Sequence, residues 1–112
     1  MANVYKNIQA KVTSAGSFDD MYTAPAETTS IVKTIKLFNT HGSALDVEIK
    51  IYDASSTTDY EYDIANVTAS DGVDLLTFNN IIILEAGDII RMKCATGNVI
   101  KMTAAVLQTS RT

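Results

Sequence analysis

Tryptophan is absent from this 112-residue sequence, and cysteine and histidine occur once each. The single cysteine, Cys94, excludes a disulfide framework within one chain and a zinc site built from cysteines. The single histidine, His41, cannot form a histidine-based metal centre unless several chains contribute ligands to it. The residue types therefore indicate no resident metal and no cofactor.

Basic residues are also few, with 9 Lys and Arg against 13 Asp and Glu and a net charge of -4. A protein that binds DNA or RNA needs a basic surface, so nucleic acid is not an expected partner. No long apolar stretch follows Lys6, and the longest aliphatic run, residues 81–84, is too short to span a bilayer. We therefore expect no membrane partner, and synthesis in a reducing cytosol.

Residues branched at the β-carbon are abundant in the sequence. There are 12 Ile, 8 Val and 14 Thr but only 6 Leu, and the branched residues fit the pleated surface of a strand better than a helix. The 5 glycines lie among small or polar residues between apolar segments, where turns belong. Because 112 residues is the length of one domain, we expect a single all-β domain.

Alternation of apolar and polar residues predicts about eight strands. The clearest is residues 45–52, in which Leu45, Val47 and Ile49 share one face and charged residues share the other. The remaining strands are expected at residues 4–12, 31–38, 59–67, 73–78, 81–84, 88–94 and 99–107. Short strands separated by turns favour an antiparallel two-sheet β-sandwich, with the jelly roll as one form of it.

The same pattern predicts which strands pair and which residues face the core. We expect residues 31–38 and 45–52 to form a hairpin closed by residues 39–44. The expected inward residues of three strands are Ile31, Ile35 and Leu37, then Ile90, Met92 and Cys94, and finally Ile100, Met102, Ala104 and Val106. Residues 14–112 then form the sandwich domain, and residues 1–13 form an N-terminal strand or docking arm.

Acidic residues gather in one region, because eight lie between Ile51 and Ile90 with no Lys or Arg among them. Asp59, Glu61 and Asp63 alternate along one predicted strand and so would share one face. Three carboxylates there would suit a hard cation such as calcium, or would form a solvated sheet edge whose like charges discourage aggregation. Since no loop has calcium-ligand spacing around a turn-forming glycine, we prefer the edge and assign no metal.

Two aromatic residues, Tyr60 and Tyr62, lie between these acids. Aromatic rings among acidic residues have the wrong charge for stacking on single-stranded nucleic acid. They would suit stacking on a sugar ring, so a carbohydrate-binding module is one alternative function.

No arrangement of residues indicates catalysis. His41 lies in a predicted loop with no nucleophile nominated beside it, and Cys94 lies on an apolar strand face, where a thiol acts as a small hydrophobe. We therefore expect a protein that is not an enzyme. A hydrolase that uses Asp59, Glu61 and His41 is the remaining enzymatic alternative.

The order of several segments resembles a known family. Met21-Tyr22-Thr23-Ala24-Pro25-Ala26 is followed by Thr28, Thr29 and an aliphatic segment that runs from Ile31 to Asn39. Further along, an Ala-Gly-Asp turn at residues 86–88 leads from Leu84 into Ile89. Over roughly residues 13–107, this succession resembles the small structural proteins of tailed phages.

The resemblance implies a β-sandwich virion component that is made in the host bacterial cytoplasm. Proteins of this kind are capsid decoration or cement proteins, neck or collar pieces, and parts of tail fibres, and the pattern does not distinguish among these roles. We expect capsid decoration first, with a homo-oligomer, for example a trimer, that binds the major capsid protein and stabilises the shell. The alternative is a neck, collar or tail-fibre component, or a carbohydrate-binding module at the tip of a tail fibre.

Apolar residues near the N-terminus form the predicted interface. Those in the expected docking arm lie on an alternating segment, whereas those that follow lie in a stretch without clear periodicity. The second group either folds back onto the domain's own core or docks on a neighbouring copy or on the shell. The predicted interface consists of Val4, Tyr5, Ile8, Phe18, Met21 and Tyr22.

Overall fold

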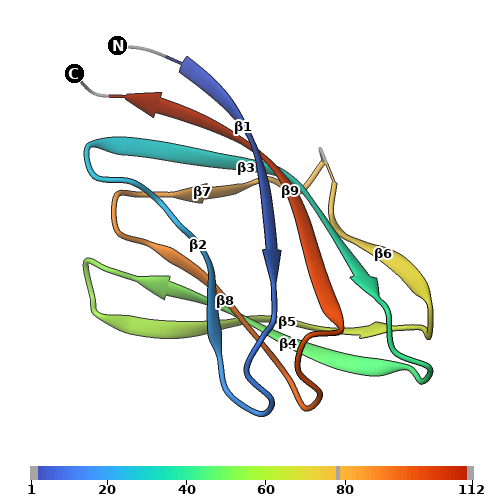
Figure 1. Cartoon of the computed structure of the whole chain (residues 1–112). Coiled ribbons are helices and arrows are strands. Elements are labelled where there is room, and N and C mark those ends of the chain that lie inside the picture. Colours follow the sequence, from blue (N-terminus) through green and yellow to red (C-terminus); the bar gives the residue numbers. More distant parts are fainter. Residues whose placement is uncertain (1–2, 78, 111–112) are drawn as a thin grey trace.

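Two antiparallel sheets packed face to face make up the computed structural model, which describes residues 3–77 and 79–110 (Figure 1). Nine strands occur among these residues, and the predicted all-β sandwich is confirmed. The strands are β1 (Asn3–Lys11), β2 (Asp19–Thr23), β3 (Thr28–Asn39), β4 (Leu45–Asp53), β5 (Thr58–Val67), β6 (Asp71–Leu76), β7 (Ile82–Leu84), β8 (Ile89–Cys94) and β9 (Ile100–Ser110). In this part of the chain no helix is long and apolar enough to cross a membrane.

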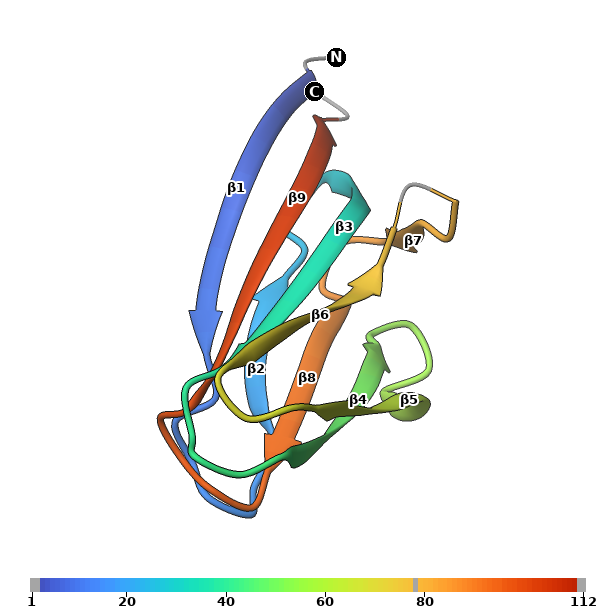
Figure 2. The same ribbon diagram turned by 90° about the vertical axis from the view of Figure 1, so that its right-hand side faces the viewer.

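The order of strands in each sheet is that of a jelly roll. Sheet A has the order β1-β9-β3-β6, with β7 also paired to β3, and sheet B has the order β2-β8-β4-β5. Strands β6 and β7 lie end to end on the same side of β3, because β6 pairs with residues 35–39 and β7 with residues 30–32. Most connections therefore pass from one sheet to the other (Figure 2).

The core lies between the inner faces of the two sheets. The predicted inner set of β9 is confirmed, since Ile100, Met102, Ala104 and Val106 are all buried. In sheet B the predicted inner residues of β8 are also confirmed as buried, and these are Ile90, Met92 and Cys94. Burial of these apolar side chains is the main term that favours the folded chain, at about 25 cal/mol for each Å² removed from water.

The predicted hairpin between residues 31–38 and 45–52 is wrong. Strand β3 pairs with β6, β7 and β9 in sheet A, whereas β4 pairs with β5 and β8 in sheet B. The turn at residues 39–44 crosses the sandwich, and the buried side chain of Asn39 fixes this crossing. Its amide donates to the carbonyls of Ser43 (2.9 Å) and Val67 (3.1 Å), and its oxygen accepts from the His41 N–H (2.8 Å).

Two β-bulges account for further differences from the alternating pattern. The register of β3 against β9 shifts between Val32 and Thr34, so that Lys33 is an extra residue. Val32 is therefore buried, and Ile31, which was predicted to face inward, lies on the outer side of sheet A, opposite the outward residue Leu107. Strand β2 was not predicted, because a bulge at Met21 places two consecutive residues, Met21 and Tyr22, inside.

The predicted N-terminal strand is confirmed as β1, which pairs with β9 along its whole length, from Asn3 opposite Thr109 to Lys11 opposite Lys101. In Figure 2 the first half of β1 and the last half of β9 extend beyond the end of sheet B. Val4 is for this reason 44% exposed, although its position in the alternation places it on the inner side. Strand β1 is thus part of sheet A and also its outer edge.

Candidate interaction surfaces

An apolar row crosses the outer face of sheet A. Tyr5 of β1 lies opposite Leu107 of β9, Leu107 lies opposite Ile31 of β3, and Ile31 lies opposite Ile83 of β7. Directly opposite residues in an antiparallel sheet point to the same face, so the four side chains form one line across four strands. We call these residues, Tyr5, Leu107, Ile31 and Ile83, the apolar row.

The two ends of the apolar row are the most exposed. Tyr5 is 73% exposed and Ile83 is 61% exposed, while Leu107 and Ile31 between them are half-buried. The ammonium of Lys33 lies 5.5 Å from the centre of the Tyr5 ring, which is within range of a cation–π contact. Contiguous apolar residues on an outer face, as opposed to scattered ones, are typical of a surface that contacts a partner.

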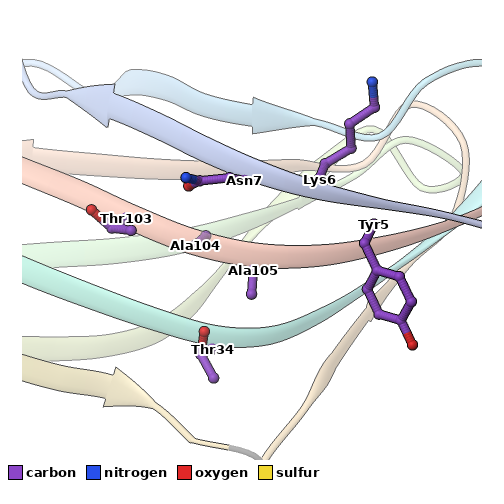
Figure 3. Close-up of a pocket in the computed structure, with 7 residues that line it drawn as sticks. All are labelled: Tyr5, Lys6, Asn7, Thr34, Thr103, Ala104 and Ala105. Atoms are coloured by element: carbon purple, nitrogen blue, oxygen red, sulfur yellow. The ribbon is translucent and has the colours of Figure 1, made fainter.

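A shallow hollow of about 490 Å³ borders the apolar row on the side of Tyr5. Figure 3 shows the Tyr5 ring and the Lys6 side chain on opposite sides of β1, as the alternation requires. The residues that line the hollow are Tyr5, Lys6, Asn7, Thr34, Thr103, Ala104 and Ala105. Small and uncharged side chains make up most of this lining, so the outer face beside the apolar row is open and only weakly polar.

The outer face of sheet B is different, because paired charges cover it. Arg91 of β8 contacts Asp20 of β2 (2.8 Å) and Asp59 of β5 (3.0 Å), and its guanidinium lies 4.5 Å from the centre of the Tyr52 ring. The hydrogen bond to Asp20, followed by the charges of Asp20 and Asp59, raises the pKa of Arg91 above its ordinary value. Lys93 and Glu48 form a further pair at 3.5 Å. These charges have partners within the chain.

Phe18, one of the predicted interface residues, lies on this charged face. The ammonium groups of Lys50 and Lys93 lie 4.6 Å and 5.0 Å from the centre of its ring. The side chain is half-buried as a result. The two lysines therefore already use the ring of Phe18 as a cation–π acceptor, and Phe18 is separated from the apolar row by the thickness of the sandwich.

The other predicted interface residues divide between surface and core. Val4 and Tyr5 are exposed on β1, and Ile8 is half-buried. Met21 and Tyr22 are 5% and 8% exposed and belong to the core, which corrects their assignment to an interface. Of the two alternatives left open by the sequence, Met21 and Tyr22 therefore fold back onto the domain's own core. The bulge in β2 turns both side chains inward.

The acidic strand β5 forms an edge of sheet B, as the edge interpretation predicts. The three carboxylates do not share a face, because Tyr62 is an extra residue between Glu61, opposite Lys50, and Asp63, opposite the inward Ile49. Asp59 instead binds Arg91, and Glu61 lies 3.9 Å from the Lys50 ammonium. No cluster of three possible metal ligands occurs among the described residues.

The two tyrosines proposed for sugar stacking lie on the same edge strand. Tyr60 is 55% exposed and Tyr62 is 40% exposed. Burial of its ring, followed by the charge of Asp63, raises the pKa of Tyr62 above its usual value of 10.0. The bulge at Tyr62 interrupts the alternation of β5 between the two rings.

The single histidine lies in a turn, and the single cysteine lies in the core. His41 lies in the crossing turn, where its Nδ1 accepts a hydrogen bond from the Ser43 N–H at 3.2 Å. Cys94 is 2% exposed, and it faces the core beside Met92. Neither side chain has a second reactive group placed to form a nucleophile and base pair in the part of the chain that the structure describes.

Comparison with known proteins gives a likeness of fold alone. No protein-family model and no curated protein matches the sequence. A Bacillus protein described in work on endospore appendages that form disulfide-linked pili has a TM-score of 0.59 at 10% identity, covering 98% of this chain and 89% of that one. A Clostridium thermocellum xylanase complexed with xylohexaose has a TM-score of 0.43 at 8% identity, covering 96% of this chain and 26% of that one. The second value is too low to support an argument.

Proposed function

We propose that this protein is a structural component of a tailed-phage virion, without enzyme activity, and that it decorates the assembled capsid. The observation that carries the proposal is the apolar row on the outer face of sheet A, which spans four strands and ends at the exposed side chains of Tyr5 and Ile83. A continuous apolar line across the outer face of a sheet suits the seam between capsid subunits.

The segments that carry the resemblance to phage structural proteins also support the proposal, because they meet in space. The Ala24 N–H donates to the Asp88 carbonyl, and the Gly87 N–H donates to the Ala24 carbonyl, both at 2.9 Å. Gly87 has a φ of 89°, a conformation that favours glycine. The segment around Pro25 and the Ala-Gly-Asp turn are thus joined by backbone hydrogen bonds, which is a reason for them to occur together in a sequence.

The mechanism would be thermodynamic linkage. A protein that binds the assembled shell but not its separate subunits stabilises the shell, by an amount that increases with the free concentration of the protein divided by its Kd. The apolar row would supply affinity by removing apolar surface from water, and the hollow beside it would accommodate a side chain of the capsid protein. A neck, collar or tail-fibre position would use the same face.

The test is to replace one end of the apolar row and measure binding to assembled particles that lack the protein. Ile83→Asp should abolish co-sedimentation with these particles and should remove the increase in their melting temperature. The matched control is Ile64→Asp, because Ile64 is also 61% exposed but lies on the outer face of sheet B, opposite Glu48. Equal binding by the two variants, or an unmodified protein that never binds particles, would refute the proposal.

Truncation is a less direct test of the predicted docking arm. Residues 3–11 pair fully with β9, and Val12 directly after them is fully buried, so removal of the arm would also expose the inner side of β9. Point substitutions at Tyr5 and Val4 are better suited, since both side chains are exposed.

Carbohydrate binding is the second candidate, and the exposure of Tyr60 and Tyr62 favours it. An aromatic ring that is open to solvent on one face stacks on a sugar ring. Titration with a panel of free glycans distinguishes the two functions, because a capsid decoration protein should bind none of them. Saturable binding that Tyr60→Ala removes would support the second candidate against the first.

A further inference from the structure

The free edge of β1 differs from the other sheet edges in this structure. The edge strands β2, β5 and β6 each carry a register shift against their neighbour, and β7 has only 3 residues. Bulges and short edge strands protect a sheet from pairing with another chain. Strand β1 has 9 residues, contains no proline and pairs with β9 without any register shift. Among residues 3–77 and 79–110 it is therefore a long and regular edge with no strand beside it, and its outward backbone groups are those that a further strand would need.

The backbone groups on this free edge can be identified from the hydrogen bonds of the ladder. In an antiparallel pair, opposite residues alternate between those that exchange hydrogen bonds and those that do not. The Val12 N–H donates to the Ile100 carbonyl at 3.0 Å, and these residues lie opposite one another when the register Lys11–Lys101 continues by one step. The even-numbered residues of β1 therefore bond to β9. The odd-numbered residues, Asn3, Tyr5, Asn7, Gln9 and Lys11, direct their N–H and C=O groups to the free edge.

We propose that β1 pairs in the antiparallel direction with β1 of a second copy, about a two-fold axis that passes beside Asn7. In this register Asn7 lies opposite Asn7, Tyr5 opposite Gln9, and Asn3 opposite Lys11. Each of these pairs joins two odd-numbered residues, so every free N–H and C=O of one β1 meets its complement on the other. The proposal concerns the edge of sheet A and does not depend on the partner of its outer face.

Charge selects this register over its neighbours. The two lysines of β1 lie opposite Ile8 (Lys6) and Asn3 (Lys11), so no like charges lie directly opposite one another. A shift of one strand by two residues in one direction places Lys6 opposite Lys6, which is unfavourable. A shift of two residues in the other direction leaves Asn3 and Val4 unpaired. A shift of one residue would join the outer side of one sheet to the inner side of the other. The central register pairs all 9 residues of β1 without these costs.

The side chains support a second copy of this chain as the occupant of the edge. On the inner side, the exposed Val4 of each copy would lie opposite Ala10 of the other copy, and the stem of Lys6 would lie beside Ile8. On the outer side, the Tyr5 ring would lie opposite Gln9. A two-fold axis between antiparallel strands is perpendicular to the sheet, so the dimer would present both apolar rows on one continuous face.

The experiment uses the fact that residue 7 faces itself at a two-fold axis. Asn7→Lys and Asn7→Asp are prepared separately, and their dimer dissociation constants are measured by analytical ultracentrifugation. Each variant alone should dimerise about five- to tenfold more weakly than the unmodified chain, because like charges lie opposite one another. An equal mixture of the two should form the mixed dimer with the original affinity or better. Asn80→Lys, the same substitution at an exposed loop residue, is the matched control and should leave dimerisation unchanged.

A second measurement keeps the test decisive if the charged variants do not fold. Asn7→Cys should form a disulfide-linked dimer under mild oxidation, since opposite residues that exchange hydrogen bonds have Cα atoms about 5.5 Å apart. Asn80→Cys should not, and the native Cys94 is buried. The proposal is overturned if the unmodified chain is a monomer at every concentration, if Asn7→Lys dimerises as Asn80→Lys does, or if mixing the charged variants restores nothing.

Discussion

The carboxylate of Asp88 accepts a hydrogen bond from the backbone N–H of Ala54 at 3.0 Å, although 34 residues separate them in the chain. The other carboxylate oxygen accepts from the Glu85 N–H at 2.9 Å, and the backbone carbonyl of Asp88 accepts from Ala24. One residue with 9% exposure thus joins three connections, those after β2, β4 and β7. The ends of both sheets are held together at this point.

Asp88→Ala should lower the free energy of unfolding by about 1–3 kcal/mol, because two part-buried backbone hydrogen bonds lose their acceptor. Urea denaturation monitored by circular dichroism measures the change. Asp74→Ala on β6 removes the same charge from an exposed position and should change stability by no more than about 0.5 kcal/mol. Equal effects of the two substitutions would show that Asp88 does not join these connections.

The turn at residues 39–44, which crosses the sandwich after β3, depends on the side chain of Asn39. Asn39→Ala should cost about 2–3 kcal/mol, since the carbonyls of Ser43 and Val67 and the N–H of His41 lose their partner in a buried site. Thermal unfolding measures the loss. Thr40→Ala, one residue later and exposed, is the control and should cost less than about 1 kcal/mol. A stable Asn39→Ala variant would mean that the crossing is fixed by the strands alone.

Most of the strands could be predicted from the sequence because the core uses strict alternation. Residues 99–107 and 88–94 alternate without interruption, and their inner faces are as expected. The exceptions are bulges, which change the alternation at one residue and leave no mark in composition. Lys33 reverses the expected side of Ile31, and Met21 hides β2 altogether. The hairpin was predicted wrongly because turn residues indicate a turn, but not whether the chain returns to the same sheet or crosses to the other.

The apolar row was only partly accessible to sequence reasoning. Tyr5 was identified, but Leu107, Ile31 and Ile83 come from three other strands and meet Tyr5 through the register of sheet A. One signal was present, since the alternation that places Val106 inside also places Leu107 outside. Apolar residues on the outer side of a predicted strand are thus worth noting before a structure is known. The assignment of Met21 and Tyr22 to an interface is corrected for the opposite reason, because a segment without clear periodicity is a strand whose bulge turns both side chains inward.

Tyr22 provides a test of this correction. Its hydroxyl lies 2.8 Å from the buried Ser30 hydroxyl and accepts a hydrogen bond from the Gln108 amide at 2.8 Å. Tyr22→Phe should cost about 1–3 kcal/mol, because Ser30 is left buried without its partner. The double variant Tyr22→Phe/Ser30→Ala should lose less than the sum of the two single variants, and urea denaturation of all four proteins measures this coupling. A residue that served only as an interface would show no loss and no coupling in the isolated chain.

Asp19 connects the end of β1 to the start of β2 and makes stability depend on pH. One oxygen of its carboxylate accepts hydrogen bonds from the N–H groups of Thr13 (2.7 Å) and Ser14 (3.0 Å). The hydrogen bond from Ser14 is the largest cause that lowers the pKa of Asp19 below its ordinary value of 3.8. The hydrogen bond from Thr13 lowers this pKa further. Just below pH 3.8 the unfolded chain therefore binds more protons at this residue than the folded chain, so stability rises with pH there.

The contribution of Asp19 should be complete above the unfolded value of 3.8 and should disappear as the pH falls through the lower, folded pKa. Asp19→Asn should remove this part of the pH dependence, so that its stability falls less steeply than that of the unmodified chain as the pH is lowered from about 4 through the folded pKa of Asp19. Urea midpoints measured at closely spaced pH values give the two slopes. Asp74→Asn, with the same change of charge at an exposed position on β6, should keep the original slope. If Asp19→Asn also keeps the original slope of stability against pH, the hydrogen bonds from Thr13 and Ser14 do not hold the carboxylate in its ionised form. Other contacts would then fix the loop before β2.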